Sequence, residues 1–292
     1  MIRRTALIIL LAYAGFGAAE AADYGIVHTP APVLNSPDFV SVFGGKNGLA
    51  LKTDRCGQTR ELEYIALPGS AVTILKKLKS GAVDICQVET KEYSAGPNVR
   101  LYLECRFLTL KESMPAERQP EAPTRATVIS ALRAAADRPY VWGGNTPFGV
   151  PELAAWFPGG ISGGERERLT LAGLDCSGLL YHATGGWTPR NTSQLVSYGH
   201  AVVIAGNSAA ELAAKLLPLD LIVWNGHVVI VLDRFTAVES RLDCGAPGNG
   251  GVVSTSLPER LAAIMRTRHP ADVWPTAKKS PPVFVVRRWY PL

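Results

Sequence analysis

The stretch Leu174-Asp-Cys-Ser-Gly-Leu-Leu-Tyr-His-Ala-Thr184 decides the fold of the C-terminal part of this 292-residue chain. It follows a glycine-bearing loop, and its apolar run predicts a helix from Cys176 to Thr184 that ends at Gly185-Gly186. A thiol at the amino end of a helix meets unpaired backbone N–H groups and the positive end of the helix dipole, and both favour the thiolate. Cys176 is therefore a candidate nucleophile, with a buried, inert cysteine as the alternative.

A thiol nucleophile needs a base within hydrogen-bond reach, and His227 is the best of the five histidines. It follows the turn Trp224-Asn-Gly226 and begins the apolar stretch 227–232, which predicts a buried strand. A polar side chain at the head of such a strand needs a partner. A histidine that is simply satisfied in the core is the alternative.

Hairpin geometry supplies a partner for His227. If strands 227–232 and 235–241 pair around a turn centred on Asp233, His227 lies opposite Glu239, whose carboxylate could hold the imidazole in one tautomer. The three residues would then form a Cys-His-carboxylate triad. A turn with an even number of residues would instead pair His227 with Ser240 and turn Glu239 to the other face.

The rest of the chain predicts a small all-β domain, a linker and an α+β domain. Residues 23–110 hold short β-prone runs separated by turns, which indicate a small barrel. Residues 111–123 are charged and contain three prolines, so they are read as a linker before a domain spanning 124–292. Helices followed by consecutive strands indicate an α+β fold with an antiparallel sheet. The expected strands are 39–43, 71–75, 82–88, 100–108, 219–224, 227–232, 235–241 and 283–289, and the expected helices are 125–138, 176–184, 191–198, 208–217 and a last one capped by Ser256 that runs to 266.

The first residues predict export. Arg3 and Arg4 precede the apolar run 5–16, and Ala19-Glu-Ala21 has the spacing of a signal-peptidase site, so residues 1–22 are read as a cleaved signal peptide that leaves no stable membrane anchor. The protein is then expected in the periplasm or cell-wall space, as a monomer.

The composition of the chain indicates which kinds of partner and cofactor it can be expected to bind. Five cysteines in an exported chain indicate a disulfide framework that leaves one free thiol, with the pairing of Cys56, Cys86, Cys105 and Cys244 open. The net charge of +5 suits a surface of anionic polymers. Scattered Lys and Arg, without a basic stripe, argue against nucleic acid. There is no C-x-x-C pair or close Cys/His cluster, so no metal is expected, and the proposed chemistry needs no cofactor.

Five pieces of sequence, taken together, resemble the NlpC-type cysteine endopeptidases of bacterial cell walls, a papain-like family. They cover about residues 124–241, with 283–289 as a possible final strand, and they occur in the family's order. The N-terminal region is similar, in pattern only, to the bacterial SH3-like modules that often precede wall hydrolases. The pieces are Tyr140-Val-Trp-Gly-Gly144, Asp175-Cys-Ser-Gly-Leu179, Pro189-Arg190 with Thr192 and Ser193, Asp220-Leu-Ile-Val-Trp224, and Gly226-His-Val-Val-Ile230.

The resemblance implies a peptidoglycan hydrolase that cuts the γ-D-glutamyl bond to the diamino acid of stem peptides. Cys176 would be the nucleophile, His227 the base, and Glu239 would take a third position that is often a second histidine in the family. Tyr140 would sit beside the thiol and help to hold substrate or oxyanion. The pocket for the free amine of the stem peptide would be lined by Asp175 and Ser177, with Ser193 as a further candidate.

One segment departs from the family pattern. Residues 145–174 stand where the family has a short link, and they could form a wall or lid of the cleft or a packed surface loop. Two other functions stay open: a wall-binding protein without catalysis, and an amidase or acyltransferase on the same fold.

Overall fold

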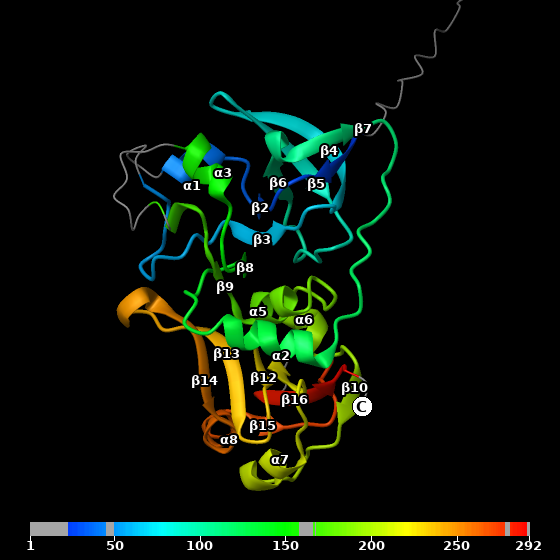
Figure 1. Ribbon diagram of the computed structural model, residues 1–292, viewed down its shortest axis with the longest axis vertical. Helices are drawn as coiled ribbons and strands as arrows, with labels where there is room; N and C mark the ends of the chain where they lie inside the picture. Colours follow the sequence, from blue (N-terminus) through cyan, green and yellow to red (C-terminus); the bar gives the residue numbers. More distant parts are fainter. Residues whose placement is uncertain (1–22, 45–49, 158–165, 167, 278–280, 291–292) are drawn as a thin grey trace, which may run out of the picture.

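The molecule has two antiparallel sheets, one in each half of the chain, and the two halves lie one above the other along its long axis (Figure 1). The computed structural model describes residues 23–44, 50–157, 166, 168–277 and 281–290. The signal peptide expected at residues 1–22 lies outside these ranges.

The N-terminal half contains a seven-stranded sheet in the order β3-β2-β6-β5-β4-β1-β7. One α-helix and one 3-10 turn accompany it. The elements are β1 (Asp23–Val27), β2 (Ala31–Leu34), α1 (Phe39–Gly44), β3 (Leu62–Ala66), β4 (Ala71–Ser80), β5 (Val83–Glu89), β6 (Leu101–Glu104), η1 (Cys105–Phe107) and β7 (Leu108–Lys111).

The C-terminal half contains a second sheet, in the order β10-β16-β11-β12-β13-β14, with helices on both faces. A two-stranded ladder, β8-β9, lies before the helix that carries Cys176. The elements are α2 (Arg125–Ala134), β8 (Asn145–Thr146), α3 (Pro151–Trp156), β9 (Gly173–Leu174), α5 (Cys176–Ala183), α6 (Thr192–Leu195), β10 (His200–Val202), α7 (Ala209–Lys215), β11 (Leu221–Trp224), β12 (His227–Val231), β13 (Thr236–Leu242), η2 (Pro247–Asn249), β14 (Gly250–Ser256), α8 (Leu257–Met265), β15 (His269–Pro270) and β16 (Val283–Arg288).

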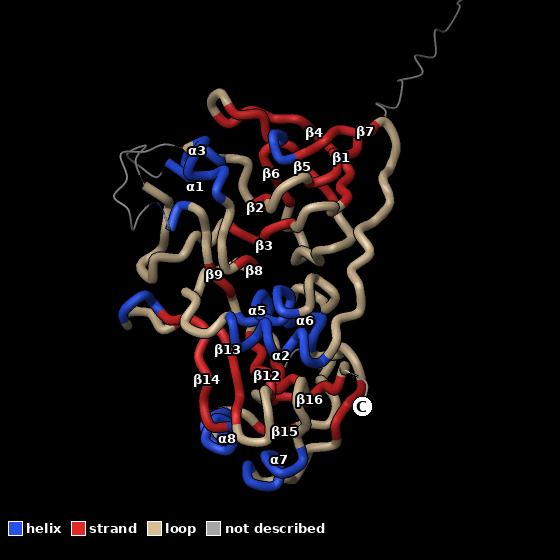
Figure 2. The backbone as a smooth tube through the Cα atoms, in the orientation of Figure 1, coloured by secondary structure: helices blue, strands red, loops and turns tan. Residues whose placement is uncertain are grey.

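Alternation along β12 divides the C-terminal core into two layers. Val228 and Ile230 pack with the buried residues of α2 and α5, whereas Val229 and Val231 pack with those of α7 and α8. Figure 2 shows α2, α5 and α6 at the upper end of this sheet, facing the N-terminal half. The amino end of α5 is therefore near the junction of the two halves. The predicted mixture of helices and an antiparallel sheet is confirmed for the described part of residues 124–292.

The N-terminal sheet is open. In the part of the chain that the structure describes, its edge strands β3 and β7 are not hydrogen-bonded to each other, so the barrel expected over 23–110 is not closed. The region is mostly β rather than all β, because it also contains α1 and η1. The strand expected at 71–75 lies within β4, and the one expected at 82–88 overlaps β5. The expected strand 100–108 is interrupted by η1, where Cys105 forms a disulfide with Cys86.

The prediction of a strand at 39–43 was wrong, because this segment is the helix α1. Phe39, Val42 and Phe43 are its buried residues, and their spacing of three and four places them on one face of a helix. Asp38 accepts a hydrogen bond from the backbone N–H of Ser41 and so satisfies a donor of the first turn. The aromatic and β-branched residue types favoured a strand, but the tertiary core uses the helical spacing.

The segment 145–174 packs into the core of the N-terminal half. Residues 158–165 and 167 lie outside the described ranges. In the described part, Val150, Leu153, Leu169 and Leu171 share one buried cluster with the N-terminal strands. The ring of Trp156 lies 4.7 Å from that of Phe107. The segment thus ties the second half to the first.

Further contacts join the two halves. A disulfide links Cys56 to Cys244, so the loop between β13 and β14 is covalently attached to the N-terminal half. Within the expected linker, Arg118 donates to the Glu92 carboxylate and to the Gly185 carbonyl. Two disulfides agree with an oxidising, extracytoplasmic compartment. None of the helices described here has the length and apolar character needed to cross a membrane.

Candidate active site

Cys176 is the first residue of α5 and the free cysteine among the five. Asp175 caps this helix: its Oδ1 accepts a 2.6 Å hydrogen bond from the Gly178 backbone N–H. The thiol is almost buried, with 7 % of the residue exposed. Its sulfur lies 3.8 Å from the carbonyl oxygen of Gly226, the residue before His227. The helix tip therefore meets the start of β12.

Gly178 permits a close approach of backbone to the helix tip. A Cβ at this position would overlap the carbonyl oxygen of Gly144, which also accepts a hydrogen bond from the Asp175 backbone N–H. The loop that begins at Tyr140 is thereby fixed against the first turn of α5.

We expect Gly178→Ala to destabilise the fold by about 1–3 kcal/mol, because the added methyl group must push the 140–144 loop away. Gly44→Ala is the matched control, since an added Cβ there meets nothing within 4 Å. Urea unfolding of both variants checks this. Equal losses of unfolding free energy would contradict the close approach.

His227 is bound to Glu239 through its Nε2, at 2.6 Å from Oε2. Glu239 has no exposed surface, and the imidazole also lies against Trp224, with ring centroids 5.1 Å apart. Because Glu239 occupies Nε2, the other ring nitrogen, Nδ1, is the one left to exchange a proton with a thiol.

The expected register of this hairpin was wrong by two residues, although the face was right. The observed pairs are Ile230 with Val238 and Val231 with Ala237, around a turn centred on Arg234. Continuing this register would put Arg241, not Glu239, opposite His227. Glu239 reaches the imidazole diagonally, which a long side chain on the same face can do. Because the loop still has an odd number of residues, Glu239 stays on the same face of the sheet as His227.

The ladder between β12 and β13 stops at Ile230, and the site lies beyond this point. His227 continues the alternation of Val229 and Val231, so its side chain lies on the α8 side of the sheet, where Glu239 also contacts Arg260. Cys176 comes from α5 on the other side. The sulfur reaches the Gly226 carbonyl at the strand end, where β13 no longer pairs. Both groups therefore lie at one end of β12.

The resting thiol is protonated. Burial and, second to it, the Asp175 carboxylate raise the pKa of Cys176 to about 12, although the Arg190 guanidinium opposes both. The effects of burial and of Asp175 outweigh the helix end that favoured a thiolate. A nucleophilic thiolate at this position therefore requires proton transfer to a base.

Asp175 and Ser177, expected to line an amine pocket, are both engaged by the buried Arg190. Its Nη1 and Nη2 donate to Oδ1 and Oδ2 of Asp175 at 3.0 and 2.7 Å, and Nη1 also donates to the Ser177 hydroxyl at 2.8 Å. Oδ1 additionally accepts from Gly178, so only Oδ2 keeps a free lone pair. The sequence motif Pro189-Arg190 contains this arginine, but nothing local in the sequence indicates its ion pair with Asp175.

Tyr140 is buried next to the same charges. Burial raises its phenol pKa, and the nearby Asp175 and Cys176 raise it further, so the hydroxyl stays protonated and can donate a hydrogen bond. Gln58 of the N-terminal half holds this loop, since its side chain donates to the Tyr140 carbonyl and accepts from the Trp142 N–H.

Ser193 is exposed on α6, and the structure gives it no hydrogen bond to Cys176 in the described residues. Its neighbour Thr192 contacts the turn before His227: the Thr192 hydroxyl accepts a hydrogen bond from the Gly226 backbone N–H at 2.9 Å. This bond holds the turn against which the Cys176 sulfur lies.

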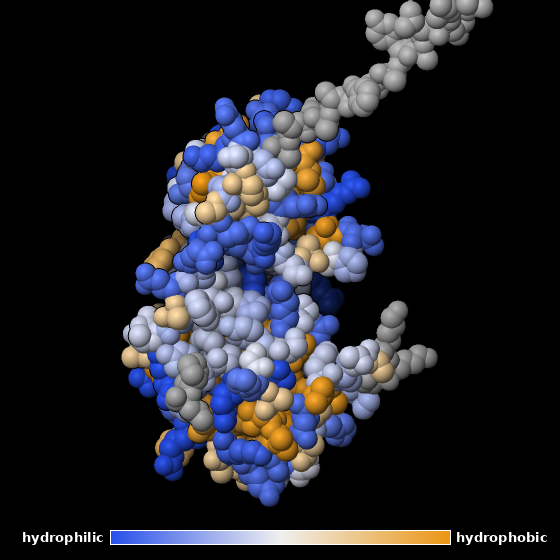
Figure 3. Space-filling view, turned by 90° about the vertical axis from the view of Figure 1, so that its right-hand side faces the viewer, coloured by the Kyte–Doolittle hydropathy of each residue, from blue (hydrophilic) through white to orange (hydrophobic). Residues whose placement is uncertain are grey.

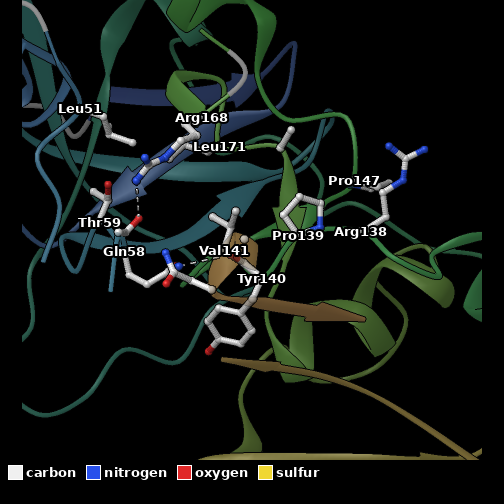
Figure 4. A pocket seen from close by; sticks show the side chains of 14 residues that line it. Leu51, Gln58, Thr59, Arg138, Pro139, Tyr140, Val141, Pro147, Arg168 and Leu171 are labelled. Atoms are coloured by element: carbon white, nitrogen blue, oxygen red, sulfur yellow. Dashed lines mark hydrogen bonds between the residues drawn. The ribbon is translucent and has the colours of Figure 1, made fainter. Parts of the chain in front are cut away.

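A cavity of about 600 Å³ lies at the junction of the two halves (Figure 4). Tyr140 is part of its wall, whereas Cys176 and His227 are not. Gln58 and Thr59 come from the N-terminal half, and Arg168 comes from the 145–174 segment. This segment therefore forms one wall of the cavity. On the face shown in Figure 3, pale and hydrophilic residues lie at mid-height, and hydrophobic residues gather in the lower half and in smaller groups in the upper half.

The pKa of Glu239 has a consequence for stability. Burial raises it, but the hydrogen bonds from His227 and Arg260 and their charges lower it more, so it stays below the ordinary value of 4.5. A depressed folded-state pKa adds stability that is present above the unfolded value and lost as the pH falls through the folded one.

We therefore expect wild type to be more stable than Glu239→Gln at pH 7, with the difference shrinking as the pH falls below about 4.5. Melting temperatures of both proteins between pH 3 and 7 check this. A constant difference over the whole range would show that Glu239 is not ionised in the fold.

Comparison with known proteins gives a likeness to NlpC/P60 structures over most of the chain. No family model and no curated protein matches. A crystal structure of an NlpC/P60 family protein from Bacillus cereus ATCC 10987 is 15 % identical, with a TM-score of 0.34, covering 93 % of this chain and 64 % of that one. The structure of NlpC2 from Trichomonas vaginalis is 13 % identical, with a TM-score of 0.33, covering 92 % and 73 %. This chain thus spans less than two thirds of the Bacillus protein.

Proposed function

We propose that this protein is an exported cysteine peptidase that hydrolyses the γ-D-glutamyl–diamino acid bond of peptidoglycan stem peptides. The observation that carries the proposal is the contact of the Cys176 sulfur with the carbonyl preceding His227, whose Nε2 is held by a buried carboxylate. A free thiol at a helix end and an oriented imidazole, both at the same end of β12, are components of thiol acyl transfer.

In the first step, His227 Nδ1 takes the thiol proton and the Cys176 sulfur attacks the γ-glutamyl carbonyl. The backbone N–H of Cys176, at the first turn of α5, has no intrahelical acceptor and is suited to bind the oxyanion. The Tyr140 hydroxyl is a second donor. His227 then protonates the leaving amine, and water, deprotonated by His227, releases the acyl group from sulfur.

Asp175 is the residue proposed to meet the free amine of the stem peptide. The remaining lone pair on its Oδ2 can accept one N–H bond from an ammonium group, and Ser177 lies beside it. Arg190 orients this carboxylate. The net positive chain suits the anionic wall polymer as partner.

Digestion of purified peptidoglycan by wild type and Cys176→Ala, followed by mass spectrometry, tests the proposal. We expect wild type to release fragments with new diamino-acid amino termini and dipeptide ends, and the variant to release none. Release of the same fragments by both proteins would remove Cys176 from the reaction.

A wall-binding protein without catalysis is the second candidate, because the buried thiol with its raised pKa is what an inert cysteine would show. Iodoacetamide at near-neutral pH separates the two. Alkylation of Cys176 supports the peptidase, whereas an unreactive thiol together with peptidoglycan binding supports the binder.

A further inference from the structure

Glu239 has a second partner besides His227. The guanidinium of Arg260 on α8 faces it, with Nη2 donating to Oε2 at 2.8 Å and Nε lying 2.7 Å from Oε1. Oε2 is the oxygen that also binds His227 Nε2. One carboxylate oxygen therefore joins the imidazole of β12 to the guanidinium of α8.

The fold places Arg260 there through the apolar face of α8. Leu257, Leu261 and Ile264 are buried against β13 and β14. Arg260 lies at the margin of this face, with 20 % of its side chain exposed, so its stem packs while its head reaches Glu239.

The charges around Glu239 require a permanent cation. The groups that face it are His227 from β12, Arg260 from α8 and, at 3.8 Å, Arg241 from its own strand. A carboxylate without exposed surface is stable as an anion only with close positive charge and hydrogen bonds. His227 gains and loses a proton in a peptidase cycle, so it cannot supply that charge throughout, and Arg241 is more distant. Arg260 supplies it in both protonation states of the imidazole.

We propose that Arg260 is a positioning residue of the site, which acts through Glu239 by keeping this buried carboxylate ionised and its Oε2 directed at His227. The inference rests on the proposed thiol chemistry. It adds a fourth residue to the Cys176–His227–Glu239 set, from an element that no motif in the sequence marked.

The consequence is a shift in pH dependence. Without the guanidinium, burial raises the pKa of Glu239 with only His227 to oppose it effectively. Glu239 then becomes protonated in mildly acidic solution and no longer supports the imidazolium that accompanies the thiolate. Reactivity of Cys176 should therefore be lost at a higher pH than in wild type.

The test is the rate of Cys176 alkylation by iodoacetamide between pH 4 and 8, since the other four cysteines form disulfides. We expect Arg260→Gln to move the acid limb upward by about 1–2 pH units. Arg260→Lys, which keeps the charge but not the fork, should give a smaller shift in the same direction. Arg266→Gln, an exposed arginine at the end of the same helix, should match wild type.

The Glu239→Gln background shows whether the effect passes through Glu239. There, Arg260→Gln should cause no further shift. A profile of Arg260→Gln that superposes on wild type, or an equal shift in both backgrounds, would overturn the proposal. If circular dichroism shows Arg260→Gln unfolded, Arg260→Lys decides: a wild-type profile for it would overturn the proposal as well. The assay uses no peptide, so failure to digest peptidoglycan would refute the proposed substrate without touching this inference.

Discussion

A His227→Ala variant should keep the fold and lose about 10³- to 10⁴-fold of kcat on stem peptides, the range for removal of a base that also acts as the acid. The reason lies in the resting state of the thiol. Burial and Asp175 favour the protonated thiol of Cys176, so without the imidazole the thiol loses the base that we propose receives its proton.

Turnover of a synthetic stem peptide at pH 7, with circular dichroism as the check on folding, measures this loss. His200→Ala is the matched control, because His200 is exposed on β10 and should leave kcat unchanged. A His227→Ala variant within tenfold of wild type would mean that another group serves as the base.

Removal of Arg190 should cost about 3–5 kcal/mol of unfolding free energy. Arg190 is only 2 % exposed, and Arg190→Met leaves the Asp175 carboxylate buried without its counter-charge. The double variant Asp175→Asn/Arg190→Met should recover part of this loss, because no uncompensated charge remains.

Urea unfolding measures these differences. Lys79→Met is the matched control: Lys79 pairs with Asp84 at the surface, where an ion pair contributes about 0–1 kcal/mol. If Arg190→Met costs no more than Lys79→Met, the Asp175–Arg190 pair does not organise the helix tip.

Much of the candidate site could be predicted because its pieces are local. Helix α5 is marked by an apolar run after a capping Asp175, and β12 by an apolar run after a turn. His227 and Glu239 share a face because side chains alternate with a period of two along a strand. A register error of two residues leaves that face unchanged. The register itself depended on the turn, where Asp233 accepts hydrogen bonds from the backbone N–H groups of Phe235 and Thr236 and so moves the turn centre to Arg234.

What the sequence could not reveal depends on contacts between distant segments. The helix at 39–44 forms because its aromatic rings enter a core that also takes Leu153 and Leu171, more than a hundred residues away. The pairing of Cys56 with Cys244 likewise joins the two halves. No local sequence pattern marks Arg260 as part of the site, because a single arginine at the edge of the buried face of a helix is common. The domain boundaries at 110 and 124 stay a prediction.

The central claim is that Cys176 attacks the substrate with His227 as its base, and trapping the acyl-enzyme tests it most directly. Wild-type protein would be mixed with a stem peptide, quenched with acid within milliseconds to seconds, and its mass measured intact and after digestion. We predict an added mass equal to the amino-terminal acyl part of the peptide, located on Cys176 and absent from His227→Ala. Product formation without any adduct on Cys176, or with the adduct on another residue, would contradict the account.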